Sequence, residues 1–217
     1  MKFILPILLV VLSLFADGTK YKDGTECECD SIEHFFYDNN VLAWEIPYVN
    51  GKRNGNGIFY ATDGTKSRVT PYVNGQVHGI ESIFSDKNTI IKQTIYVNGK
   101  RHGIERMFFD SGSLFLETPY INDKRNGTEK EYYESGTLRY STPYVKSIKH
   151  GLEKSYFENG KLANETSFSK GKKHGAEKEY FSNGKLAGSA IYDEGVLVGL
   201  KICTDGRKGN ESLDCTK

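Results

Sequence analysis

The sequence predicts an all-β fold, an extended single-sheet meander of β-hairpin repeats with a 24-residue period. A fixed short period is typical of repeat architectures. Turn residues recur about every 8–12 residues, which leaves no room for helices or parallel crossovers. An aromatic residue opens each unit, at Tyr48, Tyr72, Tyr96, Tyr120, Tyr144, Phe168 and Tyr192. A glycine follows seven residues later, at Gly55, Gly79, Gly103, Gly127, Gly151, Gly175 and Gly199.

These glycines predict structural turn positions. A glycine at a fixed point of a hairpin marks a backbone angle that other residues avoid, or a close backbone approach. A second glycine follows nine residues later in five units, and Asn88 replaces it in a sixth. Asn is the other residue that tolerates the left-handed region, so a hairpin turn is expected there as well. A third turn comes just before the first glycine, in segments such as Tyr96-Val97-Asn98-Gly99.

Two strands are expected in each unit, for example Ile104–Phe109 and Leu114–Ile121, which are rich in β-branched and aromatic residues. Neighbouring strands lie about 4.8 Å apart, so each unit advances the sheet by roughly 9–10 Å.

The chain begins with an apolar run, Phe3–Phe15, after Lys2 and before Ala16. This pattern predicts a secretory signal peptide over residues 1–16, because the run is shorter than the about 20 residues of a membrane span. An uncleaved N-terminal anchor is the alternative. We therefore expect an exported protein, periplasmic or secreted, with a bacterial cell envelope as the favoured location.

Three further regions follow in order. Residues 17–35 are expected to form an N-terminal leader and cap, residues 36–199 the repeat array, and residues 200–217 a C-terminal cap closed by a disulfide. Atypical ends are expected, because terminal units must cap an otherwise open sheet edge.

Charge argues against nucleic acid as a partner. Removing residues 1–16 takes away one of the 29 Lys and Arg residues and none of the 28 Asp and Glu residues, which leaves a balance of zero. Nucleic-acid affinity rests on neutralising phosphates, so a neutral exported chain is a poor candidate.

Four cysteines in an exported chain suggest disulfides. The two ends of the array should lie on the order of 60 Å apart, whereas a disulfide needs Cα atoms within about 7 Å. We therefore predict a Cys203–Cys215 bridge. For Cys27 and Cys29, a local bridge, pairing between chains and a reduced state all stay open.

Four histidines share one position in their units, at His78, His102, His150 and His174, where Asn54 and Asn126 stand elsewhere. Equivalent positions lie roughly 9–10 Å apart, too far for one metal ion. The alternation with Asn indicates a turn residue, and no metal or cofactor is expected. Proton sensing is an alternative, since His titrates near pH 6.5.

Basic residues gather at the same turn and would lie along one rim of the sheet. One hypothesis is a cationic binding stripe for anionic head groups or an acidic partner. The alternative is a solvated rim that blocks edge-to-edge aggregation. The residues are Lys52, Arg53, Lys100, Arg101, Lys124, Arg125, Lys149, Lys172 and Lys173.

Aromatic pairs recur within the units, at Phe108 and Phe109, Tyr132 and Tyr133, Tyr156 and Phe157, and Tyr180 and Phe181. Adjacent residues of a strand point to opposite faces, so one ladder is expected to pack within the array. The other ladder is predicted to face outward, either as a binding face for a protein or a glycan, or as stacking that stiffens a thin sheet.

The recurring pattern Y-x-x-G-x-x-x-G-x-(E or G) with a later glycine resembles the MORN repeat, in the variant with Glu where the parent pattern has Gly. The first unit keeps the parent form, Gly55-Asn56-Gly57, and the last unit departs with Lys201. The other units carry Glu81, Glu105, Glu129, Glu153 and Glu177. The resemblance implies the hairpin array over about residues 36–201, and implies little about function.

We expect a non-catalytic scaffold for protein interactions, since no phosphate loop, nucleophile elbow or HExxH segment occurs. The alternatives are an envelope-surface binder of anionic lipid or glycan, and an antitoxin-type partner of a toxin, which the resemblance would allow and an export signal argues against. A homodimer through the terminal units is a further alternative. Three sequons, at Asn126, Asn164 and Asn210, matter only in a eukaryotic secretory pathway.

Overall fold

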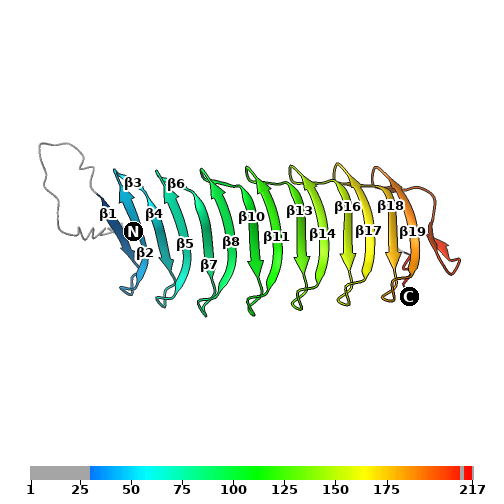
Figure 1. The fold of residues 1–217 in the computed structure, drawn as a ribbon, viewed down its shortest axis with the longest axis horizontal. Coiled ribbons are helices and arrows are strands. Elements are labelled where there is room, and N and C mark those ends of the chain that lie inside the picture. Colours follow the sequence, from blue (N-terminus) through cyan, green and yellow to red (C-terminus); the bar gives the residue numbers. More distant parts are fainter. Residues whose placement is uncertain (1–29, 211–212, 217) are drawn as a thin grey trace, which may run out of the picture.

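The computed structural model describes residues 30–210 and 213–216 as one long antiparallel sheet (Figure 1). These residues form 22 strands and no helix, which confirms the all-β prediction. The predicted signal peptide, the leader up to residue 29, and Cys27 and Cys29 lie outside the described residues.

Each unit is a hairpin of one six-residue strand and one eight-residue strand. The six-residue strands are β1 (Ser31–Phe36), β4 (Gly55–Tyr60), β7 (Gly79–Phe84), β10 (Gly103–Phe108), β13 (Gly127–Tyr132) and β16 (Gly151–Tyr156). The eight-residue strands are β2 (Leu42–Val49), β5 (Lys66–Val73), β8 (Ile90–Val97), β11 (Leu114–Ile121), β14 (Leu138–Val145), β17 (Leu162–Ser169) and β19 (Leu186–Asp193).

The sheet grows in the order of the chain. Within a hairpin, β10 pairs with β11, and between hairpins β11 pairs with β13. The same two kinds of pairing run from β1–β2 to β19–β21, so each strand lies beside its neighbours in sequence. Such local pairing is what a 24-residue hairpin period predicts.

A wide loop joins the two strands of each hairpin. In the β10–β11 hairpin, the Phe109 amide donates to the Ser113 carbonyl at 2.9 Å, and the Gly112 amide donates to the Phe109 carbonyl at 2.8 Å. Gly112 has φ +85° and Asn88, at the same position, has φ +58°. This is a three-residue loop that needs a left-handed residue at its end, which explains why Gly and Asn exchange there.

A tight turn joins each hairpin to the next and creates a short strand that the sequence analysis did not include. Asn98 and Gly99 both have positive φ, as a two-residue type I′ turn requires. The turn pairs Val97 with Lys100. The short strands are β3 (Lys52–Arg53), β6 (Gln76–Val77), β9 (Lys100–Arg101), β12 (Lys124–Arg125), β15 (Ile148–Lys149) and β20 (Val196–Leu197), while in β18 (Lys172–Tyr180) the short and the long strand are continuous.

The first glycine of each unit has both predicted features, a backbone angle that other residues avoid and a close approach to a neighbouring strand. Gly127 has φ +118°, which L residues rarely adopt, and a Cβ built on it would lie 3.0 Å from Pro119 Cγ. Gly55, Gly79 and Gly151 face Pro47, Pro71 and Pro143 in the same way. The glycine therefore lets the chain leave the tight turn while it passes closely over the preceding strand.

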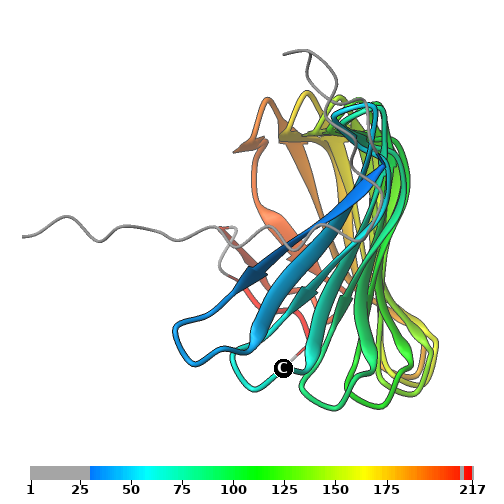
Figure 2. The same cartoon turned by 90° about the vertical axis from the view of Figure 1, so that its left-hand side faces the viewer.

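The sheet is curved and twisted rather than flat. Viewed along its long axis, the hairpins arch, and successive loops are displaced around that axis (Figure 2). A bulge recurs near the end of each six-residue strand, for example between Met107 and Phe108. Bulges increase the local bend and twist, which accounts for the repeated arch.

The ends differ from the predicted boundaries. β1 begins at Ser31 and pairs with β2, so residues 31–35 belong to the first hairpin rather than to a leader. At the other end, β21 (Lys201–Cys203) pairs with β19, and β22 (Lys208–Gly209) pairs with β21. The predicted C-terminal cap therefore first adds two strands to the sheet and only then ends it.

Candidate functional site: the two faces of the sheet

Strand alternation divides the side chains into two faces. In the β10–β11 hairpin, Glu105, Met107, Leu116, Thr118 and Tyr120 share one face, because Glu105 pairs with Thr118 and Met107 with Leu116. We call this the tyrosine face. The opposite face carries Ile104, Arg106, Glu117, Pro119 and Ile121, and we call it the aliphatic face.

A hydrogen bond on the tyrosine face joins neighbouring hairpins at the five interior junctions. Thr94 Oγ1 donates to Glu105 Oε2 at 2.9 Å, and Thr118 Oγ1 donates to Glu129 Oε2 at 2.9 Å. Thr118 is 2% exposed and Glu105 is 7% exposed. The same bond links Thr70 with Glu81, Thr142 with Glu153, and Thr166 with Glu177. The Glu of the repeat variant is therefore a junction residue.

Both partners of this bond change together at the two ends of the array. Gly57 stands where the Glu is expected, and the position of the partner Thr is occupied by Ile46. A Cβ on Gly57 would lie 3.3 Å from Ile46 Cγ1 and 2.9 Å from Tyr72 Cε2. At the other end Lys201 replaces the Glu and Ala190 replaces the Thr. This pairing signal was present in the sequence, as threonines 11 residues before each Glu, and the sequence analysis missed it.

The nine predicted rim residues do not form one rim. The side chains of Arg53, Arg101, Arg125, Lys149 and Lys173 lie on the tyrosine face, each over the opening aromatic ring of the next unit. Arg101 Cζ lies 4.1 Å from the Tyr120 ring centre, and Arg125 Cζ lies 3.9 Å from the Tyr144 ring centre. Cation–π contacts of this kind stabilise the junction between units.

These internal cations also pair with the junction carboxylates. Lys173 Nζ lies 2.6 Å from Glu177 Oε1, and Arg125 Nη1 lies 3.6 Å from Glu129 Oε2. Burial raises the pKa of the Tyr120 and Tyr144 hydroxyls, and the neighbouring Glu105 and Glu129 carboxylates raise them further. The surroundings of these two hydroxyls therefore favour their neutral form.

The remaining rim lysines, Lys52, Lys100, Lys124 and Lys172, are exposed on the aliphatic face. Lys100 stands across from Val97, and Lys124 across from Ile121. Both aliphatic side chains are exposed.

Exposed aliphatic side chains continue along this edge of the sheet. We define the aliphatic band as Ile32, Val73, Ile80, Val97, Ile121, Val145, Ile148, Leu152, Ile191 and Val196, each at least 39% exposed. Half-buried Pro71, Ile95, Pro119 and Pro143 lie between them. The band crosses every hairpin, and its sequence signal, a Val or Ile after most opening tyrosines, was not used in the sequence analysis.

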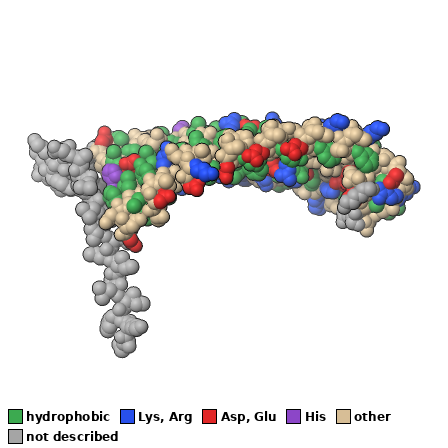
Figure 3. All heavy atoms as spheres, turned by 90° about the horizontal axis from the view of Figure 1, so that it is seen from below, with side chains coloured by type: hydrophobic (Ala, Val, Ile, Leu, Met, Phe, Trp, Pro, Cys, Tyr) green, Lys and Arg blue, Asp and Glu red, His purple; other side chains and the backbone are tan. Residues whose placement is uncertain are grey.

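The other part of the aliphatic face is polar. Arg106 Nε donates to Glu117 Oε1 at 2.9 Å, and Lys154 Nζ lies 3.3 Å from Glu165 Oε1. Figure 3, which shows the array from the lower edge of Figure 1, likewise has acidic and basic side chains interspersed along the array rather than a patch of one sign.

The aromatic pairs do not provide an exposed ladder. All eight side chains are half-buried. Tyr180 Oη donates to Glu165 Oε2 at 3.2 Å, and Tyr133 Oη donates to the Tyr156 carbonyl at 2.8 Å. Both contacts cross from one hairpin to another, so these rings connect units instead of forming the predicted outward binding face.

His78, His102 and His150 occupy the kink after the short strand, whereas His174 lies within the continuous β18. The His78 amide donates to the Pro71 carbonyl at 3.0 Å, as the Asn54 amide does to Pro47 at 2.9 Å. His174 Nδ1 lies 3.0 Å from Asp193 Oδ1 beside Glu194, and all three are exposed. Lys172 Nζ lies 3.3 Å from Glu194, so one of the two carboxylates already has a cationic partner.

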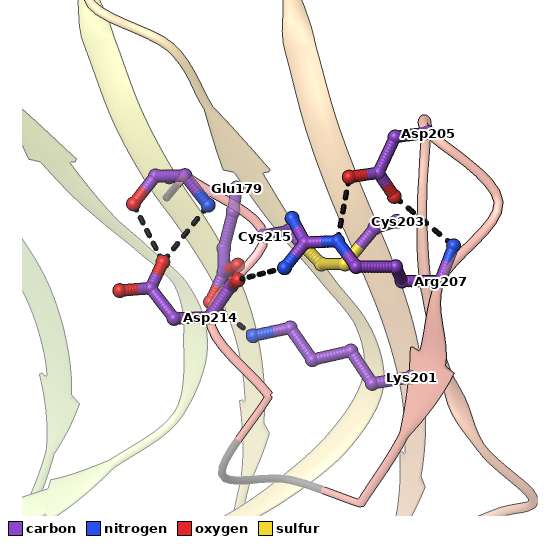
Figure 4. Close-up of a disulfide and its surroundings, with 8 residues drawn as sticks. Glu179, Lys201, Cys203, Asp205, Arg207, Asp214 and Cys215 are labelled. Atoms are coloured by element: carbon purple, nitrogen blue, oxygen red, sulfur yellow. Dashed lines mark hydrogen bonds and ion pairs between the residues drawn. A yellow bond between two sulfur atoms is a disulfide. The ribbon is translucent and has the colours of Figure 1, made fainter.

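The C-terminal cap covers the last hairpin on the tyrosine face (Figure 4). Cys203 is bonded to Cys215, with Cα atoms 5.2 Å apart. A Cβ on Gly188 would lie 2.5 Å from Cys215 Sγ, so glycine admits the disulfide there. Lys201, 3% exposed, pairs with Glu179 beneath the cap.

Of the three sequons, Asn164 lies on the tyrosine face, where its Nδ2 donates to Ser155 Oγ at 3.1 Å. Asn126 Oδ1 accepts from the Lys146 amide at 3.3 Å. Asn210 follows β22 and is exposed. Within the part of the chain that the structure describes, no helix is long and apolar enough to span a bilayer.

Comparison with known families agrees with this geometry. The model of the MORN repeat variant matches residues 101–122, 125–146, 149–170 and 173–194, and the model of the MORN repeat matches residues 48–66. The second match contains Gly57, at the position where the others have Glu. No curated protein matches the chain significantly. Repeats of this family are commonly protein- or membrane-binding modules and are generally non-catalytic. The chain is a MORN repeat protein, with four consecutive units of the variant type and an earlier unit of the parent type.

Proposed function

We propose that this protein is an exported, non-catalytic scaffold that binds a protein partner along the aliphatic band. The observation that supports this most directly is the band itself. Exposed branched side chains recur in successive hairpins, on the face that the junction hydrogen bonds do not use. A contiguous apolar surface of this kind marks an interaction site.

Charge defines the partner more closely. Lys52, Lys100 and Lys124 stand directly across from Val49, Val97 and Ile121. An elongated partner with an apolar strip flanked by acidic side chains would complement both features. Aliphatic contacts supply affinity, and the lysines favour the correct orientation.

Export is part of the same proposal, and its support comes from the sequence. The apolar run Phe3–Phe15 has the form of a signal peptide, and the Cys203–Cys215 pair suits an oxidising compartment. Mass spectrometry of the protein from its native cells should find a mature N-terminus near Asp17. An intact N-terminus on a protein retained in the cytoplasm would contradict export.

An anionic membrane surface is the second candidate, favoured by the exposed lysines beside aliphatic side chains. Amphipathic surfaces of this composition bind the interface of anionic bilayers. The antitoxin and glycan alternatives of the sequence analysis are not part of this proposal, and the antitoxin role stays a prediction from the resemblance.

Site-specific photo-cross-linking in intact cells tests the proposal. A photoreactive residue at Val97, Ile121 or Val145 should give one discrete adduct. The same residue at Lys130, exposed on the polar part of that face, should not. Serine at the three band positions should abolish the adduct formed from a cross-linker at Ile148. Adducts of equal yield from Lys130 would contradict docking on the band.

Vesicle flotation separates the two candidates. Salt-sensitive flotation with anionic vesicles that is lost in Lys100→Glu/Lys124→Glu would favour the membrane. A discrete protein adduct without flotation would favour the scaffold.

A further inference from the structure

The tyrosine face is hollowed beside Tyr140. Two adjacent hollows, of about 240 Å³ and 300 Å³, lie over the β13–β14 and β16–β17 hairpins. Tyr140, 39% exposed, lines both of them, and so does Glu153. The two hollows therefore adjoin along the axis of the array.

Two repeat positions explain why the hollows occur here. In the earlier hairpins these paired positions carry bulky side chains, Phe59 with Arg68, Ile83 with Lys92, and Met107 with Leu116. The Arg68 guanidinium, for example, covers the Phe59 ring at 4.0 Å. The next two hairpins carry Glu131 with Tyr140, and Ser155 with Asn164. Ser155 and Asn164 are shorter than the side chains they replace, and Glu131 and Tyr140 are more polar than Met107 and Leu116, which leaves a polar hollow beside Tyr140.

The positions on either side of the hollows are occupied differently. Met107 and Leu116 stand at the equivalent pair on the N-terminal side. On the C-terminal side Glu179 pairs with buried Lys201, and Cys215 covers Gly188. The two adjoining hollows form a short groove over two hairpins.

The charges of this groove are balanced locally. Glu131 Oε1 lies 2.7 Å from Arg139 Nη1, Glu177 Oε1 lies 2.6 Å from Lys173 Nζ, and Glu153 pairs with Lys149. A highly charged ligand would have to break these pairs, which argues against phosphates and basic peptides. The lining is also too polar for an apolar ligand.

The groove offers hydrogen-bond donors and acceptors in close succession around an aromatic ring. Carboxylates and the Asn164 amide accept from hydroxyls, and Lys149 and Lys173 donate to oxygen atoms. The Tyr140 ring presents an apolar surface between the two hollows. A neutral polyhydroxylated ligand with alternating polar edges and C–H faces matches this arrangement.

We propose that this groove binds a neutral oligosaccharide, with Tyr140 packing against a sugar ring and Glu131, Glu153 and Asn164 accepting from sugar hydroxyls. The two hollows adjoin, so the groove has room for more than one ring of a single chain. The site lies on the opposite face from the aliphatic band and does not depend on the scaffold proposal.

Isothermal titration with chitohexaose, cellohexaose and laminarihexaose tests this site on the mature protein. At least one hexamer should bind, and Tyr140→Ala should weaken that binding by about tenfold or more, a loss of about 1.4 kcal/mol. Arg68→Ala is the matched control, because Arg68 has the same repeat position three hairpins away from the groove, and the affinity of this variant should stay within about twofold of wild type.

Asn164→Ala provides a second variant if Tyr140→Ala fails to fold, and it should weaken binding about fivefold. No binding of any hexamer at about 10 mM would overturn the proposal. Equal affinity in wild type and in folded groove variants would also overturn it. Loss of binding in Ile121→Ser instead would place the sugar on the other face and equally refute the groove.

Discussion

The two faces of the sheet use their side chains differently. On the tyrosine face, Thr118, Glu129 and Arg125 contact one another across a junction between hairpins, and Thr118 is almost fully buried. On the aliphatic face, Val145 and Ile148 pair across a tight turn and remain about half exposed. The junction residues that hold the array together are thus separated from the aliphatic band, where we propose that a protein partner binds. The same separation explains how one repeat can serve different partners without losing its fold.

The comparison predicts that stability depends on the tyrosine face and its cap, and the largest effect is expected at the disulfide. Cys203→Ala/Cys215→Ala should lower the local unfolding free energy of the cap by about 3 kcal/mol, because the closed loop is short and its ends are buried. Hydrogen exchange of the β21 amides reports this directly. The amides of β4 and β5 are the internal control, and equal exchange of β21 in both proteins would contradict the prediction.

A smaller loss is expected at the glycine that leaves the tight turn. Gly127→Ala should destabilise the array by about 2 kcal/mol, because φ is +118° and the new Cβ would meet Pro119. Gly136→Ala is the matched control, since Gly136 also has positive φ but nothing lies within 4 Å of its built Cβ. Urea unfolding should show that Gly136→Ala lowers the free energy of unfolding by about 1 kcal/mol less than Gly127→Ala does. Equal losses would mean that the contact with Pro119 has no role.

The junction hydrogen bond should contribute about 1 kcal/mol. Thr118→Val keeps the shape of the side chain and removes the donor to Glu129, which then keeps only Arg125. Urea unfolding of Thr118→Val, Glu129→Gln and the double variant measures the coupling. Additive losses in this cycle would show that the two side chains do not act as a pair.

The smallest effect is expected on the aliphatic band. Ile121→Ser should change the unfolding free energy by less than about 0.5 kcal/mol, because the side chain is 46% exposed. Thermal unfolding of Ile121→Ser and of Thr118→Val, measured under the same conditions, compares the two losses of stability. A loss as large as that of Thr118→Val would show that the band is structural, and would remove the basis of the scaffold proposal.

Much of this architecture could be predicted from the sequence. The period, the wide-loop glycines and their replacement by Asn88 follow from backbone preferences, which act locally and are visible in one unit. The basic residues were harder, because Lys100 and Arg101 are adjacent in sequence but lie on opposite faces. Because the short strand was not predicted, both residues were expected on one rim.

The candidate sites could be predicted less well. The exposure of Phe108 and Phe109 depends on how one hairpin covers the next, which the sequence of a single unit does not reveal. The hollows beside Tyr140 depend on the loss of bulk at two facing positions, Ser155 and Asn164, in neighbouring strands. Such a space appears only when the register between strands is known.

The paired loss of Thr and Glu at the terminal junctions has a consequence for the size of the molecule. Interior hairpins present a donor on one side and an acceptor on the other, so any interior hairpin can follow any other. The two terminal junctions lack these complementary groups, because they carry Ile46 with Gly57 at one end and Ala190 with Lys201 at the other. Each terminal hairpin therefore fits only its own neighbour. The array therefore combines two distinct terminal junctions with interchangeable interior hairpins. The length of the array can change in steps of one hairpin, roughly 9–10 Å, while the junction residues stay the same.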